Sequence, residues 1–488
     1  MNHSTTHSAF AAIDIGTTNI KCGVAIVGIN NSFRIIGSWR NETVSAFPGQ
    51  ALNSFSKIEA IVMECLKHLG QYCLEQQVKK IHIGISGHVS SYLNWDKDAA
   101  VPVNDFFPIW SDHTCEPALP GIRTLFKDNS AEQYLGTFLP PATNWLVTKI
   151  LHHHQHNNAG NHIILQISDA IFHRLTGGYF THFSTAVSLC HRITRAYSKD
   201  ILDALNISTD NLPEVSNDRF FTMLEMWKKK WSLPTETFVF PGVADFYASF
   251  AALDLKQEEG FILSNSSEIA GKRLGNEQVK SDRFLQTCLQ QNESILYGST
   301  QTGGNLISWF FEKIYRQPLN YENLTGLSTS TLNISPLSCP LFIPYLEGER
   351  APFWNNHLSG GFINLKTHHD MAHLFKAVLT GVAFARRLSF ESMPGNSPAM
   401  IKIGGGGARN NVWNQLRADV MGKPLLVFQE AELSILGTIL LMAAELKNDD
   451  ITNYIAALQQ TDRLNPDMRM TDLYVDQYSQ FIRYTKSF

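Results

Sequence analysis

The sequence predicts an α/β protein of two domains, and three observations support this prediction. The chain has 488 residues, which is too long for one hydrophobic core. Residues 1–90 follow the order β-β-β-α-β, and a comparable order of strands and helices recurs in the second half. We therefore expect two domains of similar design, over residues 1–250 and 251–488, on either side of a cleft.

The first domain is expected to open with a meander of three short strands and then a helix. β-type residues separated by turn residues predict strands at 10–13, 22–27 and 34–38. Apolar residues recur at spacings of three and four over 58–73, which predicts a helix with one buried face. A strand at 80–86 follows. Two further helices are expected, at 143–154 and 167–175.

The second domain is expected to follow a linker near 241–257. Its predicted strands are at 260–264, 294–298 and 402–404. Its predicted helices are at 305–315, 369–393, 411–421 and 434–445.

Composition excludes some functions. A net charge of −4 leaves no excess of positive charge to neutralise a nucleic-acid backbone. Seven cysteines without a C-x-x-C pair indicate reduced thiols. No apolar stretch is long enough to cross a bilayer, and the first ten residues lack the features of a secretory leader. We therefore expect a cytoplasmic protein without a membrane or nucleic-acid partner, and a homodimer is left open.

A turn near the start of the chain has residues suited to a phosphate. Segment 11–21 reads AAIDIGTTNIK. Asp14 can hold a metal-bound water, Gly16 lets the backbone approach an anion, and Thr17 and Thr18 can donate to phosphate oxygens. The pattern is short, so an ordinary hairpin turn is the alternative.

Two further features are candidates for a site. Four glycines, 404–407, stand between a predicted strand and a predicted helix, where a side-chain-free backbone can carry a planar base or ribose. The alternative is a permissive loop. Asp245 lies at the expected domain boundary, where it can accept a proton from a substrate hydroxyl, and the alternative is a helix N-cap.

Three segments resemble the FGGY family of carbohydrate kinases, which includes xylulokinases, gluconokinases, ribulokinases and glycerol kinases. Residues 344–354, PYLEGERAPFW, resemble its P-Y-x-x-G-E-R-x-P-x-W segment. Residues 381–385, GVAFA, resemble its G-V-A-F helix, and 405–410, GGGARN, resemble its adenosine segment. The resemblance covers almost the whole chain. It implies two actin-like, ribonuclease-H-like ATPase domains flanking a catalytic cleft, with the sugar site in the first domain and the nucleotide site in the second.

The resemblance also implies an activity and residue roles. The activity is transfer of the γ-phosphoryl group of ATP, with Mg²⁺, to a hydroxyl of a ketose-like sugar or a polyol. Asp245 falls at the position of the catalytic base, and Asp14 is expected to hold the metal through water. The residues expected to contact the nucleotide are Asp14, Gly16, Thr17, Thr18, Lys21, Ser267, Gly304, Gly405, Gly406, Gly407 and Asn410.

The second phosphate loop departs from the family pattern. G-T-S or G-T-G is expected, but residues 265–268 read NSSE. Ser266 adds a Cβ where backbone should approach phosphate, and Glu268 would repel phosphate unless its side chain turns away.

The acceptor pocket departs further. The family segments G-Q-M-H-G and W-N-D-x-R-T become GHVSS at 87–91 and WSDHTC at 110–115. Because specificity depends on paired hydroxyl contacts, these changes imply a substrate other than the common ones. The candidates for lining the pocket are His88, Trp110, Asp112 and Phe246, and each has a core or supporting role as its alternative.

Two other classes of function compete with a kinase. The altered loop at 265–268 also suits a pseudokinase or sugar sensor that binds a nucleotide without turnover. An actin-like filament protein is disfavoured because the P-Y-x-x-G-E-R segment and Asp245 have no use there.

Overall fold

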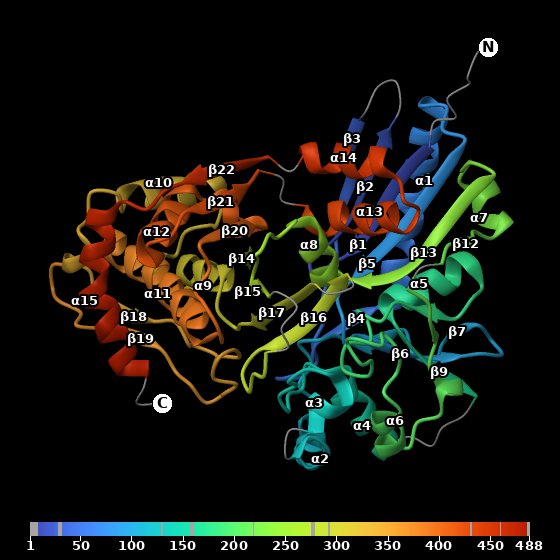
Figure 1. Ribbon diagram of the computed structural model, residues 1–488, viewed down its shortest axis with the longest axis horizontal. Coiled ribbons are helices and arrows are strands. Elements are labelled where there is room, and N and C mark those ends of the chain that lie inside the picture. The colour runs from blue at the N-terminus through green and yellow to red at the C-terminus, as the bar shows by residue number, and fades with distance from the viewer. Residues whose placement is uncertain are drawn as a thin grey trace. The chain divides into compact units, whose positions relative to one another are not determined.

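The computed structural model describes residues 8–27, 32–127, 130–156, 161–217, 219–274, 279–290, 293–429, 432–458 and 460–485. The first ten residues were expected to lack the features of a secretory leader. Residues 1–7 of that segment lie outside the described ranges. The chain forms two compact units (Figure 1). Unit 1 comprises residues 1–252 and 433–458, and unit 2 comprises residues 253–432 and 459–488.

Unit 1 is built on a six-stranded sheet in the order β12-β13-β5-β1-β2-β3. β1 is antiparallel to β2, and β2 to β3, whereas β1, β5 and β13 run parallel. The strands are β1 (Ser8–Ile15), β2 (Asn19–Val27), β3 (Ser32–Arg40), β5 (Lys80–Gly87), β12 (Phe221–Thr222) and β13 (Glu236–Ala244). The structure confirms the predicted meander and the strand after it, and each strand is longer than predicted.

Helices cover both faces of this sheet. On one face, α1 (Phe55–Glu75) packs into the apolar core formed by Ile81, Ile83 and Ile85 of β5. Alternate residues of a strand face opposite ways, so Gly84 faces the other side. There α13 (Leu433–Glu445) lies so close that a Cβ at Gly84 would come within 2.4 Å of the Thr438 side chain.

Helix α13 therefore belongs with unit 1, although its sequence position lies within the expected second domain, 251–488. The helix itself was predicted. Its apolar residues include Ile435, Leu436 and Ile439, which are all fully buried and must pack against an apolar surface. Gly23 of β2 and Gly84 of β5 leave room for the helix to pack on the sheet of unit 1.

The segment expected as a linker, 241–257, is mostly regular structure. It contains the end of β13 and helix α8 (Asp245–Ala252), and unit 2 begins at residue 253. The two other helices predicted in the first half are α4 (Leu146–His156) and α5 (Ile167–Thr176). The smaller elements of unit 1 are β4 (Leu52–Ser54), β6 (Tyr92–Asp96), β7 (Val101–Pro102), β8 (Phe106–Pro108), β9 (His162–Gln166), β10 (Phe180–Thr181), β11 (Glu214–Val215), α2 (Leu119–Leu125), α3 (Ser130–Leu135), α6 (Lys199–Leu205), α7 (Glu225–Lys230) and α14 (Asp449–Leu458).

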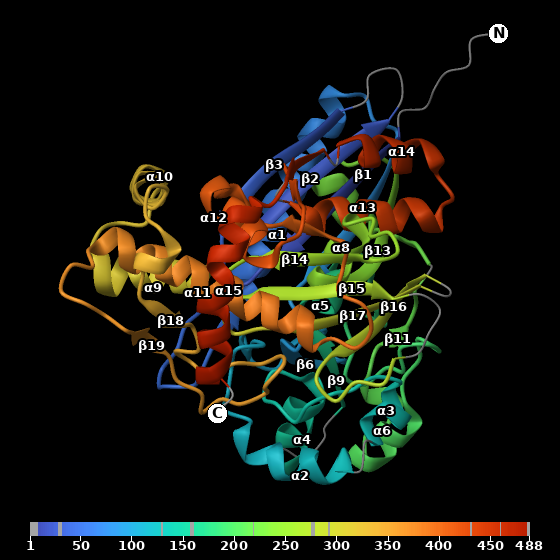
Figure 2. The ribbon, with the colours of Figure 1, turned by 60° about the vertical axis from the view of Figure 1, so that its left-hand side comes forward.

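Unit 2 repeats the same sheet design. Its seven strands have the order β16-β17-β15-β14-β20-β21-β22, and β14, β15 and β17 run side by side in Figure 2. β14, β15 and β17 are antiparallel neighbours, whereas β14, β20 and β21 are parallel, as are β1, β5 and β13 in unit 1. The strands are β14 (Glu259–Ser264), β15 (Glu268–Leu274), β16 (Leu285–Gln290), β17 (Glu293–Ser299), β20 (Met400–Gly404), β21 (Leu425–Phe428) and β22 (Thr461–Leu464).

The helices predicted in the second half are present. The stretch 305–315 is α9 (Gly304–Trp309) followed by a π-helical turn (Phe310–Tyr315), and 369–393 is α11 (Met371–Ser392). The helix at 411–421 is α12 (Asn411–Met421). The other elements are α10 (Tyr321–Ser330), α15 (Met468–Thr485), β18 (Leu341–Ile343) and β19 (Gly361–Ile363). Among the described residues, no helix has both the length and the apolar character needed to cross a membrane.

Candidate active site

The parallel strands of unit 1 bring three predicted site residues to one edge of the sheet. In the register, Ile15 of β1 and Ala244 of β13 both lie beside Gly87 of β5. His88 follows Gly87 and Asp245 follows Ala244, so both residues lie just beyond the ends of neighbouring strands, at the same level. Asp14 is one residue before the end of β1. Ligands of α/β sheets bind at the carboxyl ends of parallel strands, so this edge is the candidate site.

The turn after β1 has the tight geometry predicted for it. The Gly16 N–H donates to the Asn19 carbonyl oxygen at 3.0 Å, and a Cβ on Gly16 would come within 2.7 Å of that oxygen. Asn41 Nδ2 donates to the Gly16 carbonyl oxygen at 2.9 Å. Thr17 is half-buried and Thr18 is exposed. Only glycine fits this turn without displacing the backbone.

Asp14 is held from the neighbouring strand. Ser86 Oγ donates to Asp14 Oδ1 at 2.6 Å, and the two residues are partners in the β1–β5 register. Lys21 is the β2 partner of Asp14, so the two side chains project from the same face of the sheet. A carboxylate and an ammonium group are thereby placed beside the phosphate-type turn.

Asp245 is the first residue of α8 and is half-buried. Its Oδ1 accepts a hydrogen bond from the Phe246 N–H at 2.6 Å. Burial, and to a smaller extent the negative charge of Asp14, together raise the pKa of Asp245 to about 7. A carboxylate with a pKa near neutrality suits a general base.

Asp245 fulfils its alternative role, that of a helix N-cap, only in part. A capping side chain serves the N–H groups two or three residues ahead, whereas the bond made by Asp245 goes to its immediate neighbour. The corner between β13 and α8 is fixed by other groups. The Ala244 N–H donates to Ser184 Oγ at 3.1 Å, and Thr185 Oγ1 donates to the Gly242 carbonyl oxygen at 2.7 Å.

His88 is buried, and its side chain is neutral. Its Nδ1 lies 2.5 Å from Ser91 Oγ, and burial lowers its pKa to about 4. Within the part of the chain that the structure describes, His88 Nε2 has no hydrogen-bond partner. Because a buried polar atom without a partner is costly, a ligand hydroxyl that reached Nε2 would satisfy it.

The other acceptor-side candidates differ in their surroundings. Trp110 Nε1 donates to Thr17 Oγ1 at 3.0 Å, which joins Trp110 to the phosphate-type turn. Phe246 is half-buried beside Asp245 and packs edge-on against Phe250.

Asp112 is almost fully buried. Its Oδ2 accepts from the Ala51 N–H at 2.9 Å and its Oδ1 from the Thr114 N–H at 3.0 Å. Both oxygens are therefore used within the protein, which favours the supporting role that was its alternative. It holds the loop that carries Trp110.

In unit 2 the predicted nucleotide residues gather around the loop between β14 and β15. The Gly304 N–H donates to the Asn265 carbonyl oxygen at 2.9 Å, and the Asn305 N–H donates to the Ser266 carbonyl oxygen at 2.8 Å. The Gly406 N–H lies 3.3 Å from Asn265 Oδ1. This loop, which carries Ser267, thus touches both the start of α9 and the glycine run.

The glycine run fits closely against β14. Gly405 has a φ of +95°, and a Cβ there would come within 2.7 Å of the Ser264 carbonyl oxygen. A Cβ on Gly407 would come within 2.2 Å of Ser264 Oγ, whereas a Cβ on Gly406 would meet nothing within 4 Å. Gly406 is the member of the run that presents open, exposed backbone.

Asn410 closes this part of the site. Its Oδ1 accepts from the Trp413 N–H at 3.1 Å and caps α12, and its Nδ2 donates to Ser328 Oγ at 2.9 Å. The side chain therefore already has partners in the protein, and any contact with adenosine would add to these bonds.

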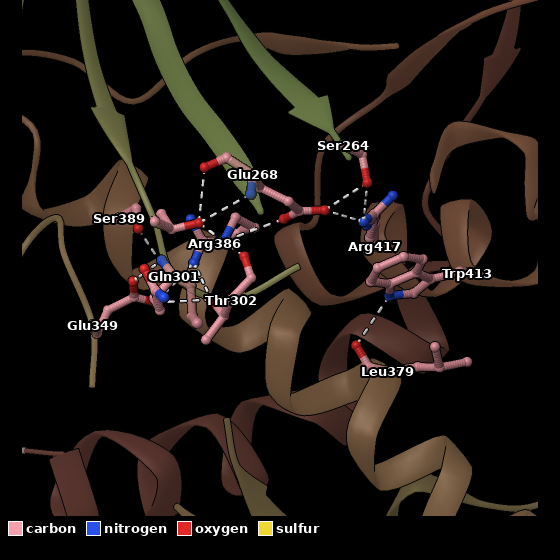
Figure 3. A network of polar contacts seen from close by, with 12 residues as sticks. Ser264, Glu268, Gln301, Thr302, Glu349, Leu379, Arg386, Ser389, Trp413 and Arg417 are labelled. Atoms are coloured by element: carbon pink, nitrogen blue, oxygen red, sulfur yellow. Dashed lines mark hydrogen bonds and ion pairs between the residues drawn. The ribbon is translucent and has the colours of Figure 1, made fainter. Parts of the chain in front are cut away.

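Glu268 turns away from the loop and into the interior. Figure 3 shows its side chain between Arg386 of α11 and Arg417 of α12. Its Oε1 accepts from Ser264 Oγ at 2.7 Å and pairs with Arg417, and its Oε2 lies 3.4 Å from Arg386 Nε. The repulsion of phosphate that the sequence suggested is therefore offset by two cations.

The same network includes the P-Y-x-x-G-E-R segment. Glu349 Oε2 accepts from Thr302 Oγ1 at 2.8 Å and lies 3.4 Å from Arg386 Nη2. Its Oε1 accepts from the Gln301 N–H at 2.5 Å.

The sequence reasoning missed Arg386 and Arg417. The available signal was a charged residue among the apolar positions of a predicted helix, because such a residue must find a buried partner.

The residues at the carboxyl edge of unit 1 fit Mg²⁺. Magnesium is commonly held by one or two carboxylates, with water and substrate phosphates completing its coordination. The charge of Asp14 raises the pKa of Asp245, so the two carboxylates repel each other, and a cation on Asp14 would relieve that repulsion.

The two repeated sheets are those of a protein with two actin-like domains. The chain belongs to the FGGY family of carbohydrate kinases: the family's N-terminal domain matches residues 9–252 and its C-terminal domain matches residues 271–446. The protein is therefore a carbohydrate kinase, a phosphotransferase with an alcohol group as acceptor.

Individual relatives cover most of the chain. A glycerol kinase of Aquifex aeolicus is 25% identical over 88% of both proteins, and a xylulose kinase of Bacillus subtilis is 24% identical over 88% of this chain and 87% of its own. A xylulose kinase of Lactococcus lactis is 30% identical over 52% of each. The gluconate kinase structure from Lactobacillus acidophilus has a TM-score of 0.85 at 19% identity, covering 99% of this chain and 98% of that one.

Proposed function

We propose that this kinase transfers the γ-phosphoryl group of ATP to a hydroxyl of a neutral, ketose-like sugar or a polyol, with Asp245 as the general base. The observation that carries the proposal is the position of Asp245 at the carboxyl edge of unit 1, one strand away from His88. Its pKa of about 7 leaves it ionised in a useful fraction of molecules at neutral pH.

In this proposal Asp245 orients the acceptor hydroxyl and receives its proton as the new P–O bond forms. Phosphoryl transfer requires little covalent help, so positioning and charge stabilisation supply most of the rate. The Phe246 N–H fixes one oxygen of the carboxylate, and the other oxygen would receive the proton.

Each unit by itself offers groups suited to a phosphate. Thr17, Thr18 and Lys21 offer donors and a positive charge beside Asp14. Ser267, Gly304 and the run 405–407 supply hydroxyl and backbone groups, with Asn410 behind them. Asp14 would hold Mg²⁺ through water, and the bound ion supplies positive charge that offsets the charge developing on the transferred group.

The acceptor side supports a neutral substrate. His88, Trp110 and Phe246 contribute an uncharged imidazole and two aromatic faces, and none of the three carries a positive charge to pair with a carboxylate. Sugars bind through hydroxyl hydrogen bonds and apolar ring contacts. This surface suits a ketose or a polyol better than a sugar acid.

The alternative of an inactive nucleotide-binding protein has no support. It was motivated by Ser266, Ser267 and Glu268, and the carboxylate of Glu268 lies buried against Arg386 and Arg417. We also propose a cytoplasmic location, which the seven free cysteines support. A homodimer is proposed as well, and sedimentation of the purified protein tests it.

The proposed function is tested by acceptor-dependent release of ADP. The full chain is assayed with ATP and Mg²⁺ against a panel of pentuloses, hexuloses, heptuloses and polyols, with gluconate as the charged comparison. We expect turnover with one neutral class and none above background with gluconate. ATP binding without ADP release for every acceptor would overturn the proposal, and turnover only with gluconate would overturn its substrate class.

A further inference from the structure

We propose that Glu268 is a positioning residue for the nucleotide: through Arg386 and Arg417 it fixes the loop 265–267 against the other segments of the nucleotide site. This inference rests on the proposed function. It assigns a use to the residue that departs most clearly from the family pattern.

The loop 265–267 is the junction of the candidate nucleotide site. The Asn265 and Ser266 carbonyl oxygens accept from the first N–H groups of α9, and Asn265 Oδ1 lies 3.3 Å from the Gly406 N–H. Any displacement of the loop therefore displaces its contacts with both neighbouring segments at once.

A cluster of four buried charged side chains joins both ends of the loop. Its members are Glu268, Glu349, Arg386 and Arg417. Ser264 precedes the loop and Glu268 follows it, and the two are linked by the hydrogen bond of 2.7 Å from Ser264 Oγ to Glu268 Oε1. Arg417 Nη2 donates to Ser264 Oγ at 2.9 Å and also pairs with Glu268. The guanidinium group thus closes the base of the loop.

The cluster is balanced in charge and sealed from solvent. It contains two acids, Glu268 and Glu349, and two bases, Arg386 and Arg417, and none of the four is more than 1% exposed. Burial lowers the pKa of Arg417 to about 10, so it stays cationic at neutral pH. Removing one charge leaves its partner uncompensated in the interior.

The cluster also ties the loop to rigid elements. Arg386 stands on α11 and Arg417 on α12, and the guanidinium of Arg417 lies 3.5 Å from the centre of the Trp413 ring. Trp413 Nε1 in turn donates to the Leu379 carbonyl oxygen at 3.1 Å, as Figure 3 shows. The loop therefore takes its position from two helices, α11 and α12.

The test is Glu268→Gln, which keeps the size of the side chain and removes its charge. Because phosphate contacts depend on atomic placement, we expect the KM for ATP and the Kd for ADP to rise about ten-fold, with the KM for the acceptor changed by less than about two-fold. ADP binding is measured by calorimetry on the full chain.

A matched control separates positioning from general stability. Glu259 of β14 pairs with Lys402 Nζ at 3.0 Å and is also buried, but it lies at the other end of the strand from the loop. We expect Glu259→Gln to lower the Tm to a similar extent and to leave the Kd for ADP unchanged. Equal losses of ADP affinity in both variants, or no loss in Glu268→Gln, would overturn the inference.

A second variant covers the case in which Glu268→Gln folds poorly. The double substitution Glu268→Gln with Arg417→Gln restores charge balance, so we expect the Tm to recover while ADP still binds weakly. Recovery of ADP affinity to the level of the unmodified protein would overturn the inference. Failure of the proposed function is distinguishable, because it would show as no turnover in the unmodified protein.

Discussion

Ser86 donates a hydrogen bond of 2.6 Å to Asp14 Oδ1 between two adjacent parallel strands. The bond fixes one oxygen of the carboxylate that we assign to the metal. Asp14 also raises the pKa of Asp245. One serine hydroxyl thus helps to set the orientation of Asp14, and with it the charge that acts on Asp245.

Replacing Ser86 with Ala should lower kcat about five-fold, because one net hydrogen bond of about 1 kcal/mol no longer orients Asp14. The Tm should fall by only a few degrees. Thr176→Val is the control, because it removes a hydroxyl that donates to a helix carbonyl oxygen in the same unit. Steady-state kinetics of both variants decide, and equal kcat values would contradict the role given to Ser86.

Asp245→Asn should abolish most turnover while folding and ATP binding persist. Asparagine keeps the shape of the side chain but cannot accept the proton, so we expect kcat to fall by about 10²–10⁴-fold. The measurements are ADP release with the best acceptor and calorimetry with ATP. A variant that turns over at the normal rate would remove Asp245 as the base.

The pH dependence of the reaction follows from the raised pKa of Asp245. The base acts when it is ionised, so kcat/KM for the acceptor should rise with pH and level off at or below about 7, because a cation on Asp14 lowers the pKa of Asp245. One pH unit below the pKa, the rate should be about ten-fold lower. The residual rate of Asp245→Asn should lack this inflection. A plateau that extends down to pH 5 would show that another group controls the rate.

The fold was largely predictable from the sequence because strand patterns and turns are local. The β-β-β-α-β order is confirmed for the six-stranded sheet of unit 1 and α1, although the short strand β4 before α1 was not predicted, and unit 2 repeats the sheet design. Helix α13 was predicted as a helix but not as part of unit 1. That assignment depends on small residues on distant strands, such as Gly84, and no local pattern indicates it.

The candidate site was predictable where the residues lie next to one another in the chain. The turn 14–18 and the glycine run were read directly from the sequence, and the structure gives them the expected tight backbone. The partners of Glu268 were not predictable, because Arg417 lies 149 positions away and pairing at that separation depends on tertiary packing. The same holds for the bond between Ser86 and Asp14.

His88 should contribute to acceptor recognition through Nε2. The matched pair of variants is His88→Asn, which retains a group near the position of Nδ1, and His88→Gln, which retains one near Nε2. We expect His88→Asn to raise the KM for the acceptor about ten-fold and His88→Gln to raise it less, with the KM for ATP unchanged in both. Equal effects of the two variants on acceptor KM would assign His88 to packing alone.

Gly406 should tolerate a side chain in the folded protein but not in the nucleotide complex. A Cβ there meets no atom within 4 Å, so Gly406→Ala should leave the Tm unchanged. If the base or ribose lies on this backbone, the added methyl group should weaken ADP binding roughly ten-fold through overpacking. Gly361→Ala is the control, because a Cβ at that position in β19 also meets nothing within 4 Å. Calorimetry with ADP on both variants decides: equal affinities would place the nucleotide elsewhere, whereas a loss confined to Gly406→Ala would locate it on the glycine run.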